Sequence, residues 1–343
     1  MKNVILIYGG EGAERDISLL SAKNVYGALA GAPYNVIPVF ISKEGGWYIG
    51  SPDPFGKSPT SGATPTYPVR LHKSSGLLVK DGILPIYAAL PILHGNFGED
   101  GIIQGALDCA HIPYVGCTVT AGAVSSDKHL TKLIARSLGI PTADWISESG
   151  TSYRDAQRAR ARAERKLGYP MFIKPTSLGS SIGASAVASE SDFDSAYFRA
   201  ARHGRVLIER LINCDYECEC AYLGIGTESL YLAEGRIDTR GKAYGYNEKY
   251  VEKNNYATLS PESPTTHRVE AMARLLGEAI GIRGLARLDF FVTESGEIYF
   301  NEINTLPGMT EASLYPKLAE RLGYSLCELF SALIEEVADD RCP

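Results

Sequence analysis

The feature that most constrains the fold of this chain is the alternation of apolar and amphipathic stretches at its N-terminal end. Apolar runs predict strands at residues 4–8, 35–41, 86–93 and 113–115. Helical patterns occupy residues 17–30 and 102–110 between them. Strands that alternate with helices form a parallel sheet covered by helices, so roughly the first 115 residues are predicted to be a parallel α/β domain.

Residues 42–67 interrupt this alternation, because they are dense in Gly, Pro, Ser and Thr. Such a composition favours turns over regular elements. We expect this segment to be an excursion between two strands of the same sheet and not a domain boundary.

The rest of the chain predicts more mixed α/β structure. With 343 residues the chain exceeds one ordinary core, so two or three domains are expected. A helix at 123–138 is followed by one at 153–167, near which a second domain begins. Further strands are predicted at 169–174, 184–188, 217–223, 230–237, 285–292 and 297–303, and further helices at 266–280 and 326–337.

The bulk composition argues against several classes of protein. No apolar run approaches the roughly 20 residues that cross a bilayer, so no membrane span is expected. The net charge is −6 and no Lys/Arg block dominates a segment, so nucleic-acid binding is not expected. Seven scattered cysteines without a secretory signal favour a reducing cytoplasm and no disulfides. We therefore expect a small-molecule substrate.

Three cysteines, Cys214, Cys218 and Cys220, are close enough in sequence to suggest a metal site. The alternation in residues 216–222 is typical of a strand, with Cys218 and Cys220 on one face. No paired C-x-x-C motif or histidine set accompanies them, so we predict a structural role.

A glycine- and serine-rich loop follows Lys174, with the sequence Pro175-Thr-Ser-Leu-Gly-Ser-Ser-Ile-Gly183. Such a loop can turn backbone N–H groups and hydroxyls toward phosphate oxygens, because glycine permits close approach and positive φ. The P-loop motif G-x-x-x-x-G-K-[ST] is absent. The residues alone leave open both a phosphate-binding loop and an ordinary hairpin turn.

Four polar residues within two apolar runs form the strongest candidate for a site. Strand alternation places Arg287 with Asp289, and Glu302 with Asn304, on one face of each strand. Two carboxylates and an amide oxygen are hard donors that suit Mg²⁺, and buried charge without a partner is costly. The pattern predicts a magnesium site, with a salt-bridged pair of edge strands as the alternative.

Six motifs in a fixed order give the chain a specific resemblance. They are Gly9-Gly10-x-x-Ala13-Glu14-Arg15-x-Ile17-Ser18, Leu93-His94-Gly95-x-x-Gly98-Glu99-Asp100-Gly101, Lys174-Pro175 through Gly183, Glu248-Lys249-Tyr250, Arg287-x-Asp289, and Asn304-Thr-x-Pro-Gly308-Met-Thr310. Together they resemble the ATP-grasp fold and, within it, the D-alanine:D-alanine ligases, over nearly the whole chain.

The resemblance implies an α/β fold of three domains. These are an N-terminal parallel-sheet substrate domain at 1–118, a central ATP-grasp domain at 119–210 and a C-terminal ATP-grasp domain at 211–343. It also implies an ADP-forming enzyme that joins two D-alanine molecules through an acyl phosphate, for peptidoglycan precursors. The implied cofactors are ATP and two Mg²⁺ or Mn²⁺ ions, and the implied assembly is a cytoplasmic homodimer.

The resemblance also implies which residues surround ATP. Phosphates would meet Lys128, Lys174, Lys249, Ser180 and Ser181, adenine and ribose would meet Glu209, Arg210, Ile212 and Glu217, and the metal ions would meet Asp289, Glu302 and Asn304. The segment 213–216 is one residue longer than is usual in the family, which leaves Glu217 less firmly assigned. Taken alone, Lys128 and Lys249 match ordinary solvated lysines.

Around the amino-acid substrates, the resemblance assigns Glu14 to the ammonium of the first D-alanine and puts His94 near it. Glu14, Ser180 and Tyr250 would form a hydrogen-bonded latch, Arg287 and the Gly308 amide would hold the oxyanion, and Ser313 and Leu314 would line the second substrate site. Taken alone, Glu14 matches an acid at a helix N-terminus and His94 matches a satisfied core histidine.

Substrate choice is less constrained. The resemblance implies that Tyr250 and Leu314 favour D-alanine over D-lactate and D-serine. This chain has Glu311-Ala312 where many members of the family have Ser-His. A D-Ala-D-Ser ligase, another ATP-grasp carboxylate-amine ligase and a catalytically silent ATP-binding module are the alternatives. The joint presence of Glu14, Arg287, Gly308 and Ser313 argues against the silent module.

Overall fold

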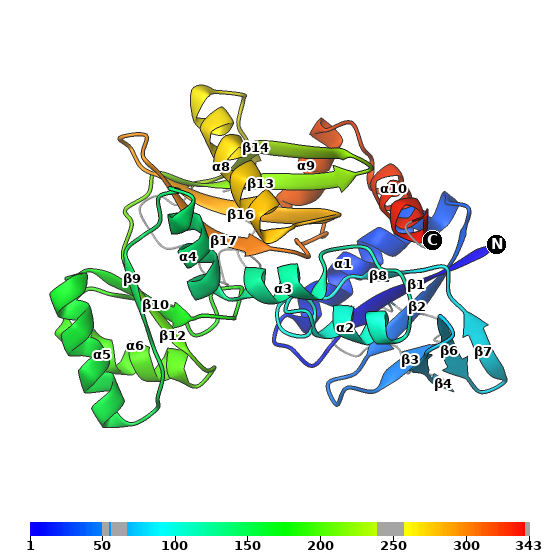
Figure 1. Ribbon diagram of the computed structural model, residues 1–343, viewed down its shortest axis with the longest axis horizontal. Helices are drawn as coiled ribbons and strands as arrows, with labels where there is room; N and C mark the ends of the chain where they lie inside the picture. The colour runs from blue at the N-terminus through cyan, green and yellow to red at the C-terminus, as the bar shows by residue number, and fades with distance from the viewer. Residues whose placement is uncertain (50–54, 56–66, 239–256, 340–343) are drawn as a thin grey trace.

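Three sheet-based units make up the part of the chain that the computed structural model describes, which is residues 1–49, 55, 67–238 and 257–339. In Figure 1 the N-terminal unit is blue to cyan, the second unit is green at the left, and the third, above them, runs from yellow-green to red. None of the helices in these ranges has the length and apolar character that a membrane crossing requires.

The N-terminal unit contains the predicted parallel sheet. Its parallel strands are β1 (Lys2–Gly9), β2 (Tyr34–Ile41) and β8 (Ala88–Pro91), with β1 in the middle. The helices α1 (Arg15–Ala28) and α2 (Ile102–Cys109) confirm the two helical predictions. Residues 113–115 form no strand, because only one bridge, between Ala89 and Tyr114, joins them to β8.

The excursion after β2 adds strands to the same sheet, as predicted, but in antiparallel orientation. The strands β3 (Trp47–Ile49) and β4 (Tyr67–Pro68) extend the β2 edge, so the sheet is mixed and not purely parallel. A separate antiparallel sheet of β5 (Arg70–His72), β6 (Gly76–Val79) and β7 (Gly82–Pro85) follows. These strands are too short to produce a clear apolar period, so the sequence analysis missed them.

The helix predicted at 123–138 is in fact two helices, α3 (Val119–Ser126) and α4 (Lys128–Ser137). Asp127 separates them in an extended conformation, and its carboxylate accepts hydrogen bonds from the N–H groups of His129 and Leu130. In a continuous helix these N–H groups would bind backbone carbonyls of the preceding turn. Here the Asp127 carboxylate accepts from them instead and caps the start of α4. Both helices pack against the last strand of the third unit.

The second unit is an antiparallel sheet with two helices on one face. Its strands, in sheet order, are β11 (Ser185–Val187), β10 (Met171–Pro175), β12 (Val206–Arg210) and β9 (Trp145–Glu148). The predicted helix is α5 (Tyr153–Lys166), and α6 (Glu190–Ala201) packs beside it on the sheet. The sequence analysis had missed α6, β9 and β12. The predicted Gly/Ser loop connects β10 to β11.

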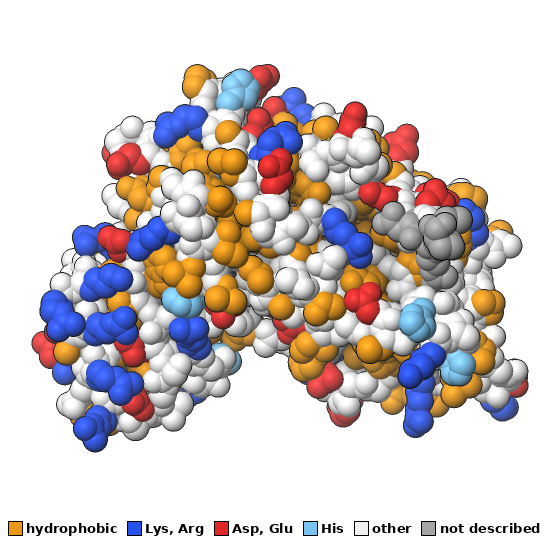
Figure 2. All heavy atoms as spheres, viewed as in Figure 1, with side chains coloured by type: hydrophobic (Ala, Val, Ile, Leu, Met, Phe, Trp, Pro, Cys, Tyr) orange, Lys and Arg blue, Asp and Glu red, His pale blue; other side chains and the backbone are white. Residues whose placement is uncertain are grey.

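The helix α5 carries a basic outer surface, and Lys and Arg side chains gather on this unit in Figure 2. Several of these arginines have acidic partners close by. Arg160 lies 3.2 Å from Glu190, and Arg162 lies 2.6 Å from Glu148. The Arg160–Glu190 pair lies at the surface and contributes little stability. Glu148 is buried, and both pairs offset the positive charge of the helix.

The third unit is an antiparallel sheet that carries the polar strands predicted from sequence. Its order is β15 (Ala257–Leu259), β14 (Glu228–Asp238), β13 (Tyr216–Ile225), β16 (Leu285–Val292) and β17 (Ile298–Asn304). The predicted helices are α8 (Pro264–Ile280) and α10 (Leu326–Asp339). The sequence analysis missed α9 (Leu314–Arg321).

The two faces of this sheet have different roles. Cys218 and Cys220 point toward α8 and are buried in an apolar core with Leu276, which is consistent with the predicted structural role. Because side chains alternate along β13, Glu219 and Ala221 point to the opposite face. Ala221 packs with Leu318 of α9 on that side, and Glu219 lines a cleft.

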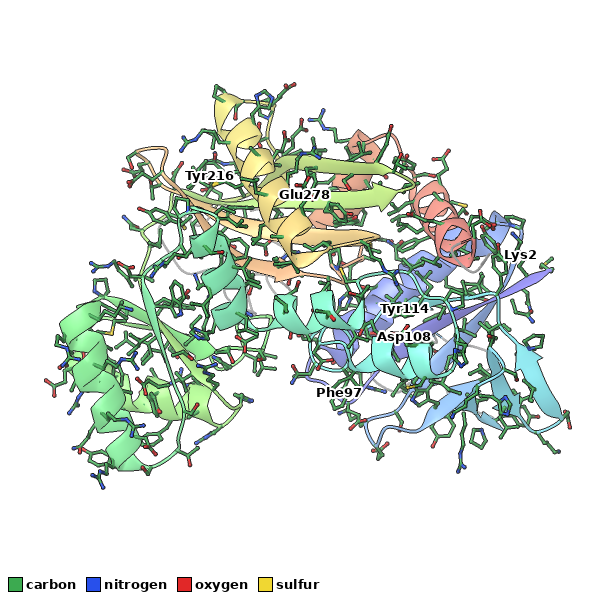
Figure 3. All side chains as sticks on the ribbon, viewed as in Figure 1. Lys2, Phe97, Asp108, Tyr114, Tyr216 and Glu278 are labelled. Atoms are coloured by element: carbon green, nitrogen blue, oxygen red, sulfur yellow. The ribbon has the colours of Figure 1, made fainter. Side chains whose placement is uncertain are left out.

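The C-terminal helix α10 returns to the N-terminal unit and packs against β8 and α1. Lys2, labelled in Figure 3, places its ammonium 2.6 Å from Glu335 of α10 and 2.8 Å from the Tyr87 hydroxyl. One hydrophobic core joins residues of the first and third units, so these units hold a defined relative position.

Replacing Asp127 by Ala is expected to lower the free energy of unfolding by about 1 kcal/mol, because α4 loses its N-terminal cap. Urea unfolding followed by circular dichroism would measure the change. The control Glu294→Ala alters an exposed turn residue and should change stability by less than about 0.5 kcal/mol. Equal effects of the two substitutions would contradict the capping role.

Candidate functional site

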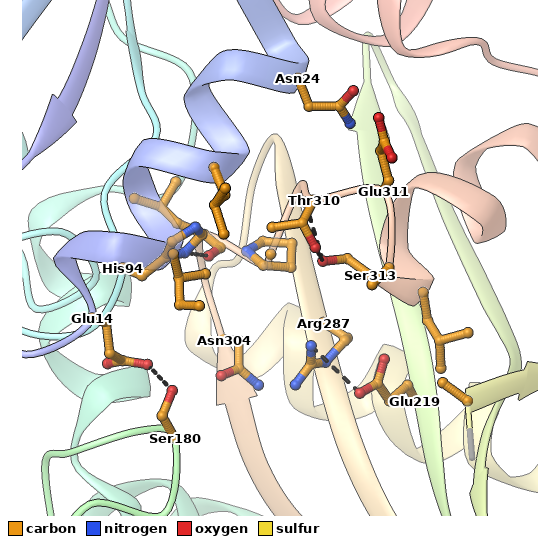
Figure 4. A pocket seen from close by; sticks show the side chains of 18 of the residues that line it. Glu14, Asn24, His94, Ser180, Glu219, Arg287, Asn304, Thr310, Glu311 and Ser313 are labelled. Carbon is orange, nitrogen blue, oxygen red and sulfur yellow. Dashed lines mark hydrogen bonds and ion pairs between the residues drawn. The ribbon is translucent and has the colours of Figure 1, made fainter. Parts of the chain in front are cut away.

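A cleft of about 810 Å³ lies where the three units meet (Figure 4). The N-terminal unit contributes Glu14, His94 and Glu99, and the second unit contributes Ser180. The helix α1 of the N-terminal unit adds Asp16, Lys23 and Asn24. The third unit contributes Glu219, Arg287, Glu302, Asn304, Gly308, Thr310, Glu311 and Ser313. Residues distant in sequence thus share one cavity.

The register of β13, β16 and β17 brings the acidic residues of the third unit into one row. Asp289 pairs with Glu219 on one side and with Glu302 on the other. Two residues farther along these strands, Arg287 of β16 pairs with Asn304 of β17. The predicted convergence of Arg287, Asp289, Glu302 and Asn304 is therefore present. Glu219 was missed, although it is separated from Glu217 by one residue in the same strand.

Arg287 is held between two carboxylates. Its Nε and Nη2 donate to the two oxygens of Asp289, each at 2.7 Å, and its Nη1 lies 3.4 Å from Glu219. Asn304 donates to Asp289 at 3.0 Å. Bidentate arginine–carboxylate pairs fix the plane of the guanidinium, so the position of Arg287 in the cleft is defined.

The predicted metal ligands fit a hard divalent cation by their donor chemistry. Asp289, Glu302 and Asn304 supply carboxylate and amide oxygens from adjacent strands, which is a set that Mg²⁺ accepts alongside water and phosphate oxygens. In the described ranges, no three His, Cys, Asp or Glu side chains form a metal cluster by themselves. Any Mg²⁺ at this place would therefore need oxygens from a ligand as well.

A second, smaller cavity of about 130 Å³ adjoins the cleft, and Ser180 and Glu302 line both. It contains all the predicted ATP residues of the described chain, namely Lys128, Lys174, Ser180, Ser181, Glu209, Arg210, Ile212 and Glu217. The backbone at Ser180 and Ser181 is left-handed, with φ of 49° and 57°. Non-glycine residues adopt this conformation uncommonly, so two of them in succession give the loop an unusual backbone.

The two lysines that line this cavity have defined acidic partners. Lys128 lies 3.0 Å from Glu302 and donates to the Leu178 carbonyl at 2.9 Å. Lys174 lies 2.8 Å from Glu209 and donates to Asn301 at 3.1 Å. Lys128 is buried, so the alternative prediction of an ordinary solvent-exposed lysine is wrong.

Glu14 and Ser180 connect the first and second units across the cleft. The Ser180 hydroxyl donates a hydrogen bond to Glu14, which stands at the N-terminus of α1. Gly179 allows this approach, because a Cβ there would lie 3.1 Å from the Glu14 carboxylate. Two members of the predicted latch are therefore in contact. The third, Tyr250, and the predicted phosphate ligand Lys249 lie outside the described residues.

His94 is a buried histidine with partners on both ring nitrogens. Its Nδ1–H donates to the Leu306 carbonyl at 2.8 Å, because a carbonyl only accepts, and its Nε2 then accepts from the Ser21 hydroxyl at 3.0 Å. The Met309 N–H donates to the same hydroxyl. Burial lowers the His94 pKa to about 4, so the ring is neutral at physiological pH. His94 thus fixes the 306–309 segment, and it also lines the cleft.

Glu99, like His94, connects the segment after β8 to the segment that begins at Leu306. Its carboxylate accepts from the N–H groups of Gly95 and Leu306, both at 2.9 Å. Burial, followed by the nearby charge of Glu14, raises the Glu99 pKa to about 8. Glu99 belongs to one of the six motifs, but no role was predicted for it, because its partner Leu306 is distant in sequence.

The segment after β17 forms the far wall of the cleft. Gly308 lines it, and Ser313 caps the turn by accepting from the Thr310 N–H at 3.2 Å. Leu314, the first residue of α9, lines the cleft and is otherwise packed in the core. Every predicted substrate residue within the described ranges therefore borders this one cavity.

Comparison with known proteins identifies the group to which this architecture belongs. A family model described as D-ala D-ala ligase N-terminus matches residues 3–117, and one described as D-ala D-ala ligase C-terminus matches residues 134–335. The chain belongs to the D-alanine–D-alanine ligase family. The family as a whole uses ATP and a divalent metal ion.

Curated relatives in this family align over almost their whole length. The D-alanine–D-alanine ligase of Deinococcus radiodurans is 37% identical over 351 residues, covering 99% of both chains. The one from Thermoanaerobacter sp. (strain X514) is 35% identical and covers 99% of this chain and 98% of the relative. The family prediction made from the six motifs is confirmed.

Solved structures agree with this assignment. The VanG D-Ala:D-Ser ligase from Enterococcus faecalis superimposes with a TM-score of 0.85 at 30% identity, covering 98% of this chain and 99% of that one. The D-alanine-D-alanine ligase from Coxiella burnetii gives 0.81 at 30% identity, over 99% and 96%. The predicted ATP-grasp fold is confirmed, whereas the division at residues 118 and 210 stays a prediction.

A Glu99→Gln variant is expected to remove a pH dependence of stability. Because the folded pKa of Glu99, about 8, lies above its ordinary value of 4.5, folding favours the protonated acid. The unfolding free energy of the wild type should therefore fall as pH rises between these values, and the variant should lack this contribution. Urea unfolding at several pH values tests this, and parallel pH curves for the two proteins would contradict it.

Proposed function

We propose that the chain joins two D-alanine molecules to D-alanyl-D-alanine at the expense of ATP, for peptidoglycan precursors. The observation that carries the proposal is that two cavities share lining residues. Ser180 and Glu302 line both a pocket with Lys128 and Lys174 and a cleft with Glu14 and Arg287. ATP in the first and an amino acid in the second would therefore meet beside Ser180 and Glu302.

In the first step, a carboxylate oxygen of the first D-alanine attacks the γ-phosphorus of ATP, and ADP leaves. Glu14 would hold the substrate ammonium, and Lys128, Lys174 and the Ser180–Ser181 backbone would hold phosphate oxygens. Phosphoryl transfer needs alignment and charge neutralisation more than a covalent enzyme intermediate, which fits a site of lysines and backbone amides. Asp289, Glu302 and Asn304 would hold Mg²⁺, which would supply further neutralisation of phosphate charge.

In the second step, the amine of the second D-alanine attacks the acyl carbon, loses a proton and displaces phosphate. Arg287 and the Gly308 N–H would stabilise the oxyanion that forms at this carbon. The pairing of Arg287 with Asp289 and Glu219 supports this role, because a guanidinium fixed in advance needs little reorganisation during the reaction. Ser313 and Leu314 would border the second substrate.

A D-Ala-D-Ser ligase is the alternative that one observation favours, namely the structural likeness to the VanG D-Ala:D-Ser ligase. The apolar Leu314 at the cleft supports D-alanine instead. Glu311 adds a carboxylate to the same wall, which makes selectivity a matter for direct competition.

We also propose a cytoplasmic homodimer. ATP, the proposed co-substrate, is made and held inside cells, which supports this compartment. Light scattering of the purified protein would test the dimer, and a mass of one chain would contradict it.

Incubation of the protein with D-alanine, ATP and Mg²⁺ should yield the dipeptide together with one ADP and one phosphate. Mass spectrometry of the products checks this, and equimolar D-serine and D-lactate in the same mixture measure selectivity. Nucleotide turnover that D-alanine does not change, without a dipeptide mass, would refute the proposal.

The Arg287→Ala variant should reduce kcat by about a hundredfold or more, because it removes one oxyanion donor. ATP binding, measured by calorimetry without metal, should change much less. The matched control Arg274→Ala removes an arginine of α8, on the other side of the sheet, and should keep full activity. Equal losses in kcat and ATP affinity would contradict the oxyanion role.

A further inference from the structure

A buried lysine that lines neither cavity stands directly behind the nucleotide pocket. Lys132 lies on α4, one turn after Lys128, and its side chain is 1% exposed. Its ammonium is 2.6 Å from Glu209 Oε1 and 6.0 Å from the centre of the Trp145 ring. Glu209 is its only ion-pair partner among the described residues.

Lys132 and Lys174 bind opposite oxygens of one carboxylate. Glu209 Oε1 contacts Lys132, whereas Oε2 contacts Lys174 at 2.8 Å. Lys174 then reaches Asn301 of β17 at 3.1 Å. The chain of contacts therefore runs from the interior, through Glu209, to an ammonium that lines the nucleotide pocket.

The charges of this cluster are unequal in number. Burial alone would raise the Glu209 pKa, but the two lysines outweigh it and lower this pKa to about 2, so the carboxylate is ionised. Burial lowers the pKa of Lys132 from its ordinary value, against the attraction of Glu209. Two ammonium groups and one carboxylate leave one net positive charge in a region shielded from water, where a charge acts more strongly than at the surface.

We propose that Lys132 is a positioning residue that offsets the charge of Glu209, so that Lys174 presents a full positive charge to the phosphates of ATP. Without Lys132, Glu209 and Lys174 would form a neutral pair, and the pocket would lose attraction for a polyanion. Glu209 still orients the Lys174 ammonium toward the pocket. This inference rests on the proposed use of ATP.

The requirement for a second lysine follows from the burial of Glu209, which is 4% exposed. A solvated carboxylate beside Lys174 would be screened by water, and it would reduce the effect of the lysine only slightly. A buried one is not screened, so its charge must be compensated from within the protein. Among the described residues, Lys132 is placed to compensate the charge of Glu209, because its ammonium contacts the carboxylate oxygen that Lys174 does not contact.

The test compares the affinity of ATP with that of adenosine, which has the same base and sugar but no phosphates. Lys132→Met should lower the ratio of ATP affinity to adenosine affinity by about tenfold, which is the effect of one unit charge on another about 12 Å away at an effective dielectric constant of about 20. The double variant Lys132→Met/Glu209→Gln restores one net positive charge, so the ratio should return close to that of the wild type. Glu209→Gln alone adds a positive charge and should raise the ratio.

Calorimetry with the full-length protein measures both affinities, and circular dichroism confirms that each variant is folded. Lys80→Met, an exposed substitution in the β6–β7 turn, is the matched control and should leave the ratio unchanged. If Lys132→Met does not fold, the increase in Glu209→Gln and the wild-type ratio in the double variant still test the charge count.

Two results would overturn the inference. One is an unchanged ratio in Lys132→Met, including the case in which ATP and adenosine binding fall equally, which indicates a purely structural role. The other is a double variant with a ratio as low as that of Lys132→Met. A wild-type protein that binds no ATP would instead refute the proposed function, so the two failures are distinguishable.

Discussion

The compensation of buried charge is the constraint on which the site depends. The third sheet places Glu219, Asp289 and Glu302 next to one another on adjacent strands, where three carboxylates would repel each other. Arg287 neutralises part of this charge from within the sheet, and Lys128 neutralises part of it from α4. Helix α4 packs on β17, where Lys128 meets Glu302, and the second unit borders the cleft through Ser180.

The same constraint shapes the connection to the N-terminal unit. His94 and Glu99 both bind backbone groups of Leu306, directly after β17. These links hold the segment with Gly308 against the turn that follows β8. A neutral His94 and a carboxyl group with a raised pKa are the results of this burial, and both tie the geometry of the cleft to the contact between units.

Much of the fold followed from local patterns. The longer elements have apolar periods that can be identified in the sequence. They are the strands β1, β2, β13, β14, β16 and β17 and the helices α1, α5, α8 and α10. The short strands β5, β6 and β7 have three or four residues each and produce no such period. The break between α3 and α4 was missed because the periods of two adjacent helices looked like one, although Asp127 is a typical capping residue.

The sequence by itself determined the types of residue at the site and the strands that carry them, because alternation along a strand is a local property. It therefore identified Arg287, Asp289, Glu302 and Asn304 as neighbours, and the motif order identified the family. Only the tertiary structure decided that Lys132 shares Glu209 with Lys174, that Glu219 joins the acidic row, and that Glu99 holds Leu306. These contacts join residues far apart in the chain, and their partners depend on how sheets and helices pack, which no local period encodes.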